Sequence, residues 1–144
     1  FAAENAAATD LPFISIIDTT VAAVARVHPA ARRVGVLAAA GCLDARLYET
    51  ALAAAGLDAI VPEGEARAAF MALVIRIKAG DLGPEVRAGM AALAQGLIDR
   101  GAEVLVLGCT EVPLVLADGD VPAPLVNSTL ELARRAVEMA RAAT

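Results

Sequence analysis

The segment VLVLGCTEVPL, residues 104–114, contains the pattern that decides the fold. Its first four residues are apolar and rich in valine, which is typical of a buried strand. Gly108 ends this run, Cys109 follows it, and a short helix is predicted for residues 111–117. Ligands of parallel α/β sheets bind outside the carboxyl ends of the strands, so the sequence places a thiol where such a site forms. A thiol at this place can become a thiolate, because helix N-termini favour negative charge.

Strand and helix patterns alternate along the rest of the chain. Further strands are predicted at residues 13–17, 34–37, 59–61 and 124–126. Helices are predicted at residues 1–8, from Asp18 or Thr19 to Val27, and at 43–55, 65–79, 84–100 and 128–143, the last capped by Asn127 or Ser128. This alternation predicts an α/β fold with a parallel sheet between two helical layers, a three-layer αβα arrangement.

The composition excludes several classes of protein. The 144 residues are enough for one hydrophobic core, and 58% hydrophobic against 20% charged residues argues against disorder. No apolar run reaches the roughly 18 residues of a membrane-spanning helix, and the first residues do not resemble a signal peptide. The net charge of −5 comes without a basic cluster, so we expect no nucleic-acid or membrane partner.

Two cysteines and one histidine limit the chemistry further. Cys42 and Cys109 do not form a disulfide framework, and with a single histidine we expect no metal site. Free thiols favour a cytoplasmic location. Lys78 is the only lysine among twelve basic residues, which indicates either a tight site that needs a compact ammonium or chance.

Several residues near the motif could form a site. Cys109 is either a catalytic thiol or a small buried hydrophobe. Thr110 offers a hydroxyl, the Glu111 carboxylate could hold nearby groups, and Gly108 permits a ligand to approach the backbone closely. Cys42 either lines the pocket or, as we favour, is a buried residue at a helix start. The serine-hydrolase and dinucleotide-binding patterns G-x-S-x-G and G-x-G-x-x-G are absent from the sequence.

The tetrad Gly108–Glu111, followed by Pro113-Leu114, resembles the second catalytic cysteine motif of the aspartate/glutamate racemase family. Glutamate racemases usually carry histidine at the position of Glu111, so the match points to the aspartate racemase-like branch. Three other segments resemble the family in order and spacing. They are residues 9–18, similar to the crossing between two lobes; residues 75–80, similar to a helix end with a substrate-binding lysine; and residues 127–129, similar to the turn that opens the closing helix.

The resemblance implies a two-lobed protein and a reaction. Residues 1–17 would be a remnant of the first lobe, residues 18–121 the second lobe, and residues 122–144 a segment and helix returning to the first. The family racemises small amino acids without pyridoxal phosphate or another cofactor, usually as homodimers. Two cysteines on opposite faces of the α-carbon act as general acid and base.

The resemblance also assigns roles to individual residues. Cys109 would be catalytic, Thr110 and Lys78 would bind the substrate, an amino acid or dicarboxylate, and Gly108, Glu111 and Asn127 would support them. The family's first catalytic cysteine would lie upstream of Phe1, so this chain supplies one cysteine only, and we expect the isolated chain to be inactive.

Two other functions remain open. Family members carry hydroxyls where this chain has Ala39 and Cys42, and this difference affects the expected substrate. A decarboxylase or isomerase of the same superfamily, acting on a small diacid, is one alternative. A non-catalytic relative that binds a dicarboxylate is the other.

Overall fold

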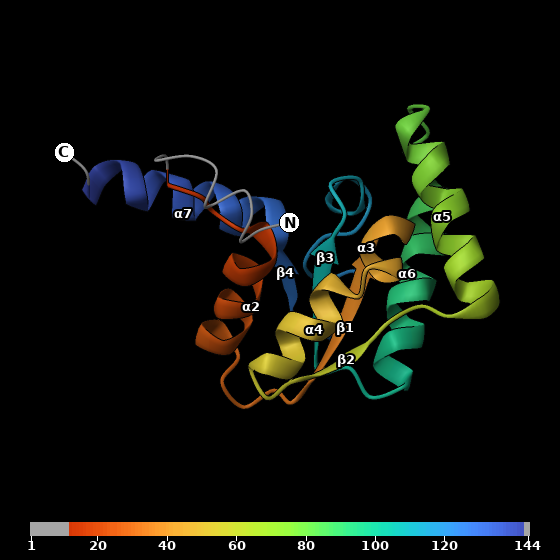
Figure 1. The fold of residues 1–144 in the computed structure, drawn as a ribbon. Coiled ribbons are helices and arrows are strands. Elements are labelled where there is room, and N and C mark those ends of the chain that lie inside the picture. Colours follow the sequence, from red (N-terminus) through yellow and green to blue (C-terminus); the bar gives the residue numbers. More distant parts are fainter. Residues whose placement is uncertain (1–11, 143–144) are drawn as a thin grey trace.

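The computed structural model describes residues 12–142, which form a parallel sheet flanked by helices (Figure 1). The elements are α2 (Ile16–Val27), β1 (Arg33–Ala38), α3 (Ala40–Asp44), α4 (Leu47–Ala54), β2 (Asp58–Ile60), α5 (Gly64–Lys78), α6 (Pro84–Asp99), β3 (Val104–Gly108), the 3-10 turn η1 (Val112–Leu114), β4 (Leu125–Asn127) and α7 (Ser128–Ala142). The strands lie in the order β2-β1-β3-β4, and every pairing is parallel. The helix predicted for residues 1–8 lies outside the described residues.

The central strand β3 contributes to two hydrophobic cores. Successive side chains of a strand point to opposite faces of the sheet. Leu105 and Leu107 therefore pack with α5 and α6, whereas Val104 and Val106 pack with α2 and α4. Figure 1 shows the sheet between these two sets of helices. The predicted three-layer α/β fold is confirmed.

The strand predicted for residues 13–17 is wrong. Helix α2 begins at Ile16, and Ser15 caps it by accepting a hydrogen bond from the Asp18 N–H at 3.2 Å. A short apolar run does not by itself distinguish a strand from a helix, and Ser-x-x-Asp is a helix-start pattern. The predicted caps, Asp18 and Thr19, lie inside the helix instead.

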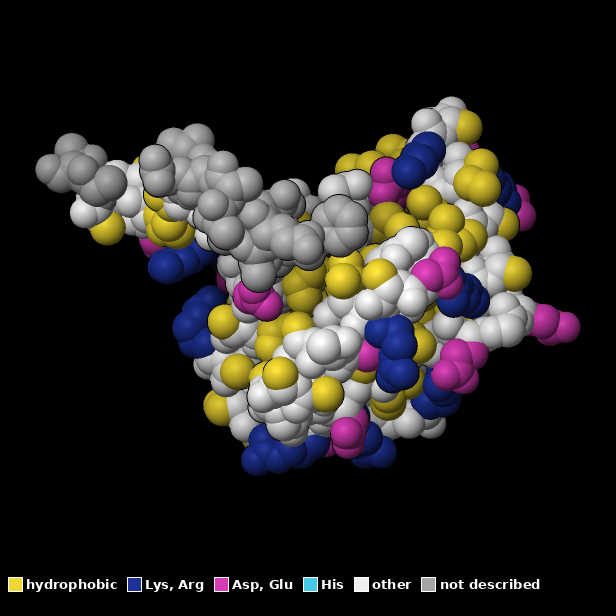
Figure 2. Space-filling view, viewed as in Figure 1, with side chains coloured by type: hydrophobic (Ala, Val, Ile, Leu, Met, Phe, Trp, Pro, Cys, Tyr) yellow, Lys and Arg dark blue, Asp and Glu magenta, His cyan; other side chains and the backbone are white. Residues whose placement is uncertain are grey.

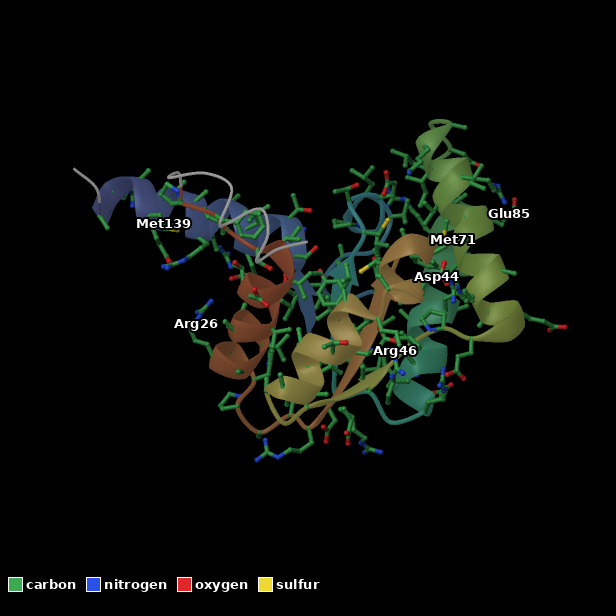
Figure 3. All side chains as sticks on the ribbon, in the orientation of Figure 1. Arg26, Asp44, Arg46, Met71, Glu85 and Met139 are labelled. Atoms are coloured by element: carbon green, nitrogen blue, oxygen red, sulfur yellow. The ribbon has the colours of Figure 1, made fainter. Side chains whose placement is uncertain are left out.

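The single helix predicted for residues 43–55 is two helices. Arg46, between α3 and α4, adopts a left-handed conformation with φ of 50°, which ends one helix before the next begins. Asp44, at the end of α3, lies next to α5 (Figure 3), where Arg67 donates to its carboxylate at 2.5 Å. Arg67 also donates to the Ala40 carbonyl oxygen at 3.2 Å, so α3 is attached to the helical layer on the other side of the sheet.

The final segment of the chain joins the same sheet. Strand β4 pairs with β3, and α7 then packs against α2. Large apolar side chains at the two ends of the described chain stay exposed, among them Phe13, Leu130 and Val137. Figure 2 shows further hydrophobic atoms at the surface over α5, where Ile75 is 64% exposed. The division of the chain after residues 17 and 121, and its association as a homodimer, stay predictions.

No helix within residues 12–142 is both long enough and apolar enough to cross a bilayer.

Packing between β1 and α6 depends on Gly35. A Cβ atom there would overlap the Leu105 side chain and lie 3.2 Å from the Cβ of Leu97 on α6. We therefore expect Gly35→Ala to lower the free energy of unfolding by about 1–3 kcal/mol, the usual cost of overpacking a core. Gly96→Ala is the matched control, because open space surrounds that helical position. The control should raise stability by up to about 1 kcal/mol. Denaturant unfolding measures both, and equal effects would contradict this account of the packing.

Candidate active site

The candidate site lies where β1 and β3 end side by side. Ala38 and Gly108 are paired at the last position of the register. Cys109 follows β3 directly, and Cys42 lies in α3, which follows β1. Because the two strands are parallel neighbours, both cysteines belong to the same edge of the sheet.

The Glu111 carboxylate holds the Cys109 side chain. Cys109 Sγ donates to Glu111 Oε2 at 2.9 Å, and Thr110 Oγ1 donates to the same oxygen at 3.0 Å. Cys109 is 8% exposed, whereas Thr110 is exposed. One carboxylate oxygen thus brings together three residues that the sequence assigns to the site.

The surroundings of Cys109 favour the neutral thiol. Burial and the hydrogen bond to Glu111 raise the pKa of Cys109 to about 11, and the Glu111 charge acts in the same direction. A backbone hydrogen bond from Glu111 and the charge of Lys78 oppose this rise. The hydrogen bond from Cys109, joined by that from Thr110, holds the pKa of Glu111 below its usual value against the effect of burial. At neutral pH the pair is therefore a thiol and a carboxylate.

The surroundings of Cys109 therefore do not give it the lowered pKa that a helix N-terminus can produce. The helix predicted for residues 111–117 is the single 3-10 turn η1, after which Asp120 Oδ2 accepts the Ala117 N–H at 2.8 Å in a tight turn. A helix favours an anion through many aligned peptide dipoles, and one turn supplies few of them. Burial and the neighbouring carboxylate consequently dominate the pKa of the thiol.

Lys78 reaches the site from the end of α5. Its Nζ lies 3.8 Å from Glu111 Oε1, and its side chain is 60% exposed. The corner between α5 and α6 is fixed by Arg76, which donates to Asp81 at 2.9 Å and to both Glu85 oxygens at 3.0 Å. Glu85 lies beside α5 in Figure 3. These ion pairs hold the helix end that carries Lys78.

Tyr48 lies directly behind the motif and is absent from the predicted site residues. A Cβ atom on Gly108 would lie 2.8 Å from Tyr48 Cε2 and 3.1 Å from Ala38 Cβ, so the glycine leaves room for the aromatic ring. Burial raises the pKa of Tyr48, and hydrogen bonding with Ser128 and Thr20 partly offsets that rise. The signal in the sequence is faint: Tyr48 is the chain's only tyrosine, and a buried phenol needs polar partners.

Cys42 stands apart from the Glu111 carboxylate. It is half-buried, and burial together with the charge of Glu49 raises its pKa, while a backbone hydrogen bond from Tyr48 lowers it. Among the residues that the structure describes, Cys42 makes no hydrogen bond with Cys109 or Glu111. Its part in lining a pocket stays a prediction.

Asn127 caps the closing helix. Its Oδ1 accepts the backbone N–H groups of Thr129 and Leu130 at 3.1 and 3.2 Å. The buried Ser128 hydroxyl donates to the Leu107 carbonyl oxygen at 2.8 Å, which ties the start of α7 to β3. The predicted cap is confirmed, and these contacts support the strand that leads to Cys109.

Other features of the described chain lie outside this group of residues. A cavity of about 660 Å³ lies between α2 and α7 and is lined by residues of those two helices alone. From residue 12 to residue 142, no group of three or more histidine, cysteine or acidic side chains is arranged to hold a metal ion.

Comparison with known proteins identifies the family. Residues 1–136 match the sequence profile described as Asp/Glu/Hydantoin racemase. The chain belongs to this family. This racemase-family chain is 34% identical over 131 residues to an uncharacterized protein from the pnlA 3′ region of Pectobacterium carotovorum subsp. carotovorum, with 87% of this chain and 83% of that protein covered. It is 39% identical over 85 residues to the glutamate racemase of Pseudomonas aeruginosa strain PAO1, with 58% and 30% covered.

Solved racemase structures share the fold. A candidate Asp/Glu racemase from Yersinia pestis superposes with a TM-score of 0.84 at 23% identity, over 93% of this chain and 58% of that one. An aspartate racemase homologue from Pyrococcus horikoshii OT3 gives 0.77 at 25% identity, over 92% and 58%. The racemase-family chain therefore spans little more than half the length of these structures and 30% of the glutamate racemase.

Proposed function

We propose that the protein is a cofactor-independent amino-acid racemase in which Cys109 transfers the α-proton on one face of the substrate. The observation that carries this proposal is the short hydrogen bond from the Cys109 thiol to Glu111 at the carboxyl end of β3. This hydrogen bond fixes the thiol at the strand end, where it can exchange a proton with a bound substrate. The glutamate racemase and the aspartate racemase homologue among the relatives support an acidic amino acid as substrate.

Inversion at the α-carbon needs an acid and a base on opposite faces. With a pKa of about 11, Cys109 is protonated at neutral pH and is the proton donor to the planar carbanion. In the reverse direction, the Cys109 thiolate that this donation leaves behind removes the α-proton and becomes the thiol again. The base on the other face is the second thiol that the family resemblance places upstream of Phe1.

Lys78 and Thr110 supply contacts for the substrate. The Lys78 ammonium is exposed and only 3.8 Å from Glu111, so a substrate carboxylate can share it without displacing a buried group. The exposed Thr110 hydroxyl lies beside the thiol and can donate to the same substrate. Both side chains lie next to Glu111, near the end of β3 where we place the α-carbon.

Lys78→Ala should raise KM for aspartate by about tenfold or more and change KM for alanine far less. A hydrogen bond to a charged group contributes about 1.5–3 kcal/mol, and only aspartate has the second carboxylate. Arg100→Ala is the matched control, because it removes another exposed cation at a helix end. Steady-state kinetics on the two substrates measure the effect. Equal rises in KM for aspartate and alanine would show that Lys78 does not bind the side-chain carboxylate of aspartate.

The neutral thiol also fits a second function. A decarboxylase of a small diacid needs one proton donor and no second base, because loss of CO2 itself leaves the carbanion. A Cys109 with a raised pKa suits that role. Ala39 and Cys42, at positions where the resembling family carries hydroxyls, favour a substrate other than that of the usual racemases.

Proton exchange separates the two functions. The full-length gene product would be incubated with L- and D-amino acids in D2O, and NMR would follow loss of the α-proton signal. Exchange with inversion of one acidic substrate supports the racemase. Absence of exchange across the panel, with a small diacid consumed, contradicts the racemase and supports the decarboxylase. A diacid bound without either reaction contradicts both.

A further inference from the structure

Tyr48 touches the backbone that carries Cys109 from the opposite face of the sheet. The position that a Gly108 side chain would occupy lies 2.8 Å from Tyr48 Cε2 and 3.3 Å from Cζ. Neighbouring residues of a strand alternate between faces, and Cys109 accordingly packs in the core on the α5 and α6 side, whereas Tyr48 packs in the core on the α2 and α4 side. The ring therefore supports the strand end directly behind the thiol.

The ring itself has no room to move. Tyr48 is 1% exposed, and its hydroxyl lies beside Ser128 and Thr20, which are 1% and 0% exposed. Ser128 donates to the Leu107 carbonyl oxygen and Thr20 to the Ile16 carbonyl oxygen, at 2.8 and 2.6 Å. Three helices, α2, α4 and α7, thus meet at the phenol.

We propose that Tyr48 is a positioning residue for Cys109. The Tyr48 ring fixes Gly108 and thereby holds the Cys109 thiol against Glu111. The 2.9 Å contact between Cys109 Sγ and Glu111 Oε2 depends on the position of the end of β3 relative to η1. The Tyr48 ring sets this position, because Gly108 has no side chain and its backbone can lie against the ring. The catalytic importance of this positioning rests on the proposed function, but neither the contact nor its test depends on turnover.

The test measures the thiol and not the reaction. In a Cys42→Ser background Cys109 is the only thiol of the chain, and its alkylation by iodoacetamide from pH 7 to pH 12 reports its pKa. Tyr48→Leu removes the ring, so the thiol loses its fixed place beside Glu111. The carboxylate then raises the pKa less, and we expect the midpoint to fall by about one unit. Tyr48→Phe keeps the ring and should leave the midpoint unchanged.

Leu52→Ala is the matched control for general loosening. Leu52 is fully buried one turn further along α4, in the same core, and its truncation should cost comparable stability. Unfolding curves recorded beside the alkylation profiles would compare the two losses. A midpoint shift in Leu52→Ala equal to that in Tyr48→Leu would overturn the proposal, as would an equal shift in Tyr48→Phe.

Gly108→Ala tests the same contact from the strand and covers the case in which Tyr48→Leu does not fold. Its methyl group would press on the ring at 2.8 Å and displace Cys109, so the midpoint should fall here as well. An unchanged midpoint in Gly108→Ala would overturn the proposal. Because the measured quantity is the alkylation midpoint and not turnover, these experiments would still test the positioning role if the racemase proposal failed.

Discussion

Cys109→Ser should lower turnover of the full-length gene product by about 10²–10⁴-fold or more, the usual loss when a positioned acid or base is removed. A serine hydroxyl is a far weaker acid than a thiol, so it can neither give a proton to the carbanion nor form the base for the reverse direction. The substrate contacts proposed for Lys78 and Thr110 are unaffected, so KM should change much less than kcat. Polarimetry or chiral chromatography of the full-length product measures the loss.

Cys42→Ser is the matched variant for that experiment. Both cysteines follow neighbouring strands at the same edge of the sheet, but only Cys109 donates to Glu111. We expect Cys42→Ser to cost less than about tenfold, well below the effect of losing a proton-transfer group. Racemisation retained in Cys109→Ser, or equal losses in the two variants, would contradict the assignment of Cys109 as the proton-transfer group.

The sequence predicts the sheet better than it predicts the helices. Strands β1 and β3 are apolar runs bounded by turn residues, and their parallel direction follows from the alternation with helices. The start of α2 depends on Ser15, whose capping bond competes with the strand-like look of residues 13–17. The break at Arg46 depends on a left-handed backbone at a residue type that gives no sign of it.

The candidate site, like the helices, can be predicted only in part from the sequence. A glycine and a cysteine at a strand end place the thiol correctly, because strand ends in parallel sheets share one edge. The charge state of the thiol depends instead on where Glu111 points and on how short η1 is, and both are set by tertiary packing. Tyr48 is far from the motif in the sequence, and only folding brings its ring to Gly108.

Glu111→Gln should lower the alkylation midpoint of Cys109 by about one unit or more, from about 11 toward the ordinary value of 9. Glutamine removes the negative charge and the strong acceptor, and both of these favour the protonated thiol. Burial remains, so the midpoint should not return fully to 9. The thiolate fraction at pH 8 would rise about tenfold, and the alkylation rate somewhat less, because a thiolate of lower pKa is a weaker nucleophile.

Thr110→Val separates the charge of Glu111 from the shape of the turn. Thr110 donates to the same carboxylate oxygen as Cys109, but it carries no charge and does not contact the thiol through a hydrogen bond of its own. Its loss should therefore leave the Cys109 midpoint close to 11, whereas Glu111→Gln lowers it. A midpoint unmoved by Glu111→Gln would mean that burial alone sets the pKa of the thiol. Glu111 would then not be the group that keeps the Cys109 thiol protonated, and its proposed part in setting the charge state of the site would be contradicted.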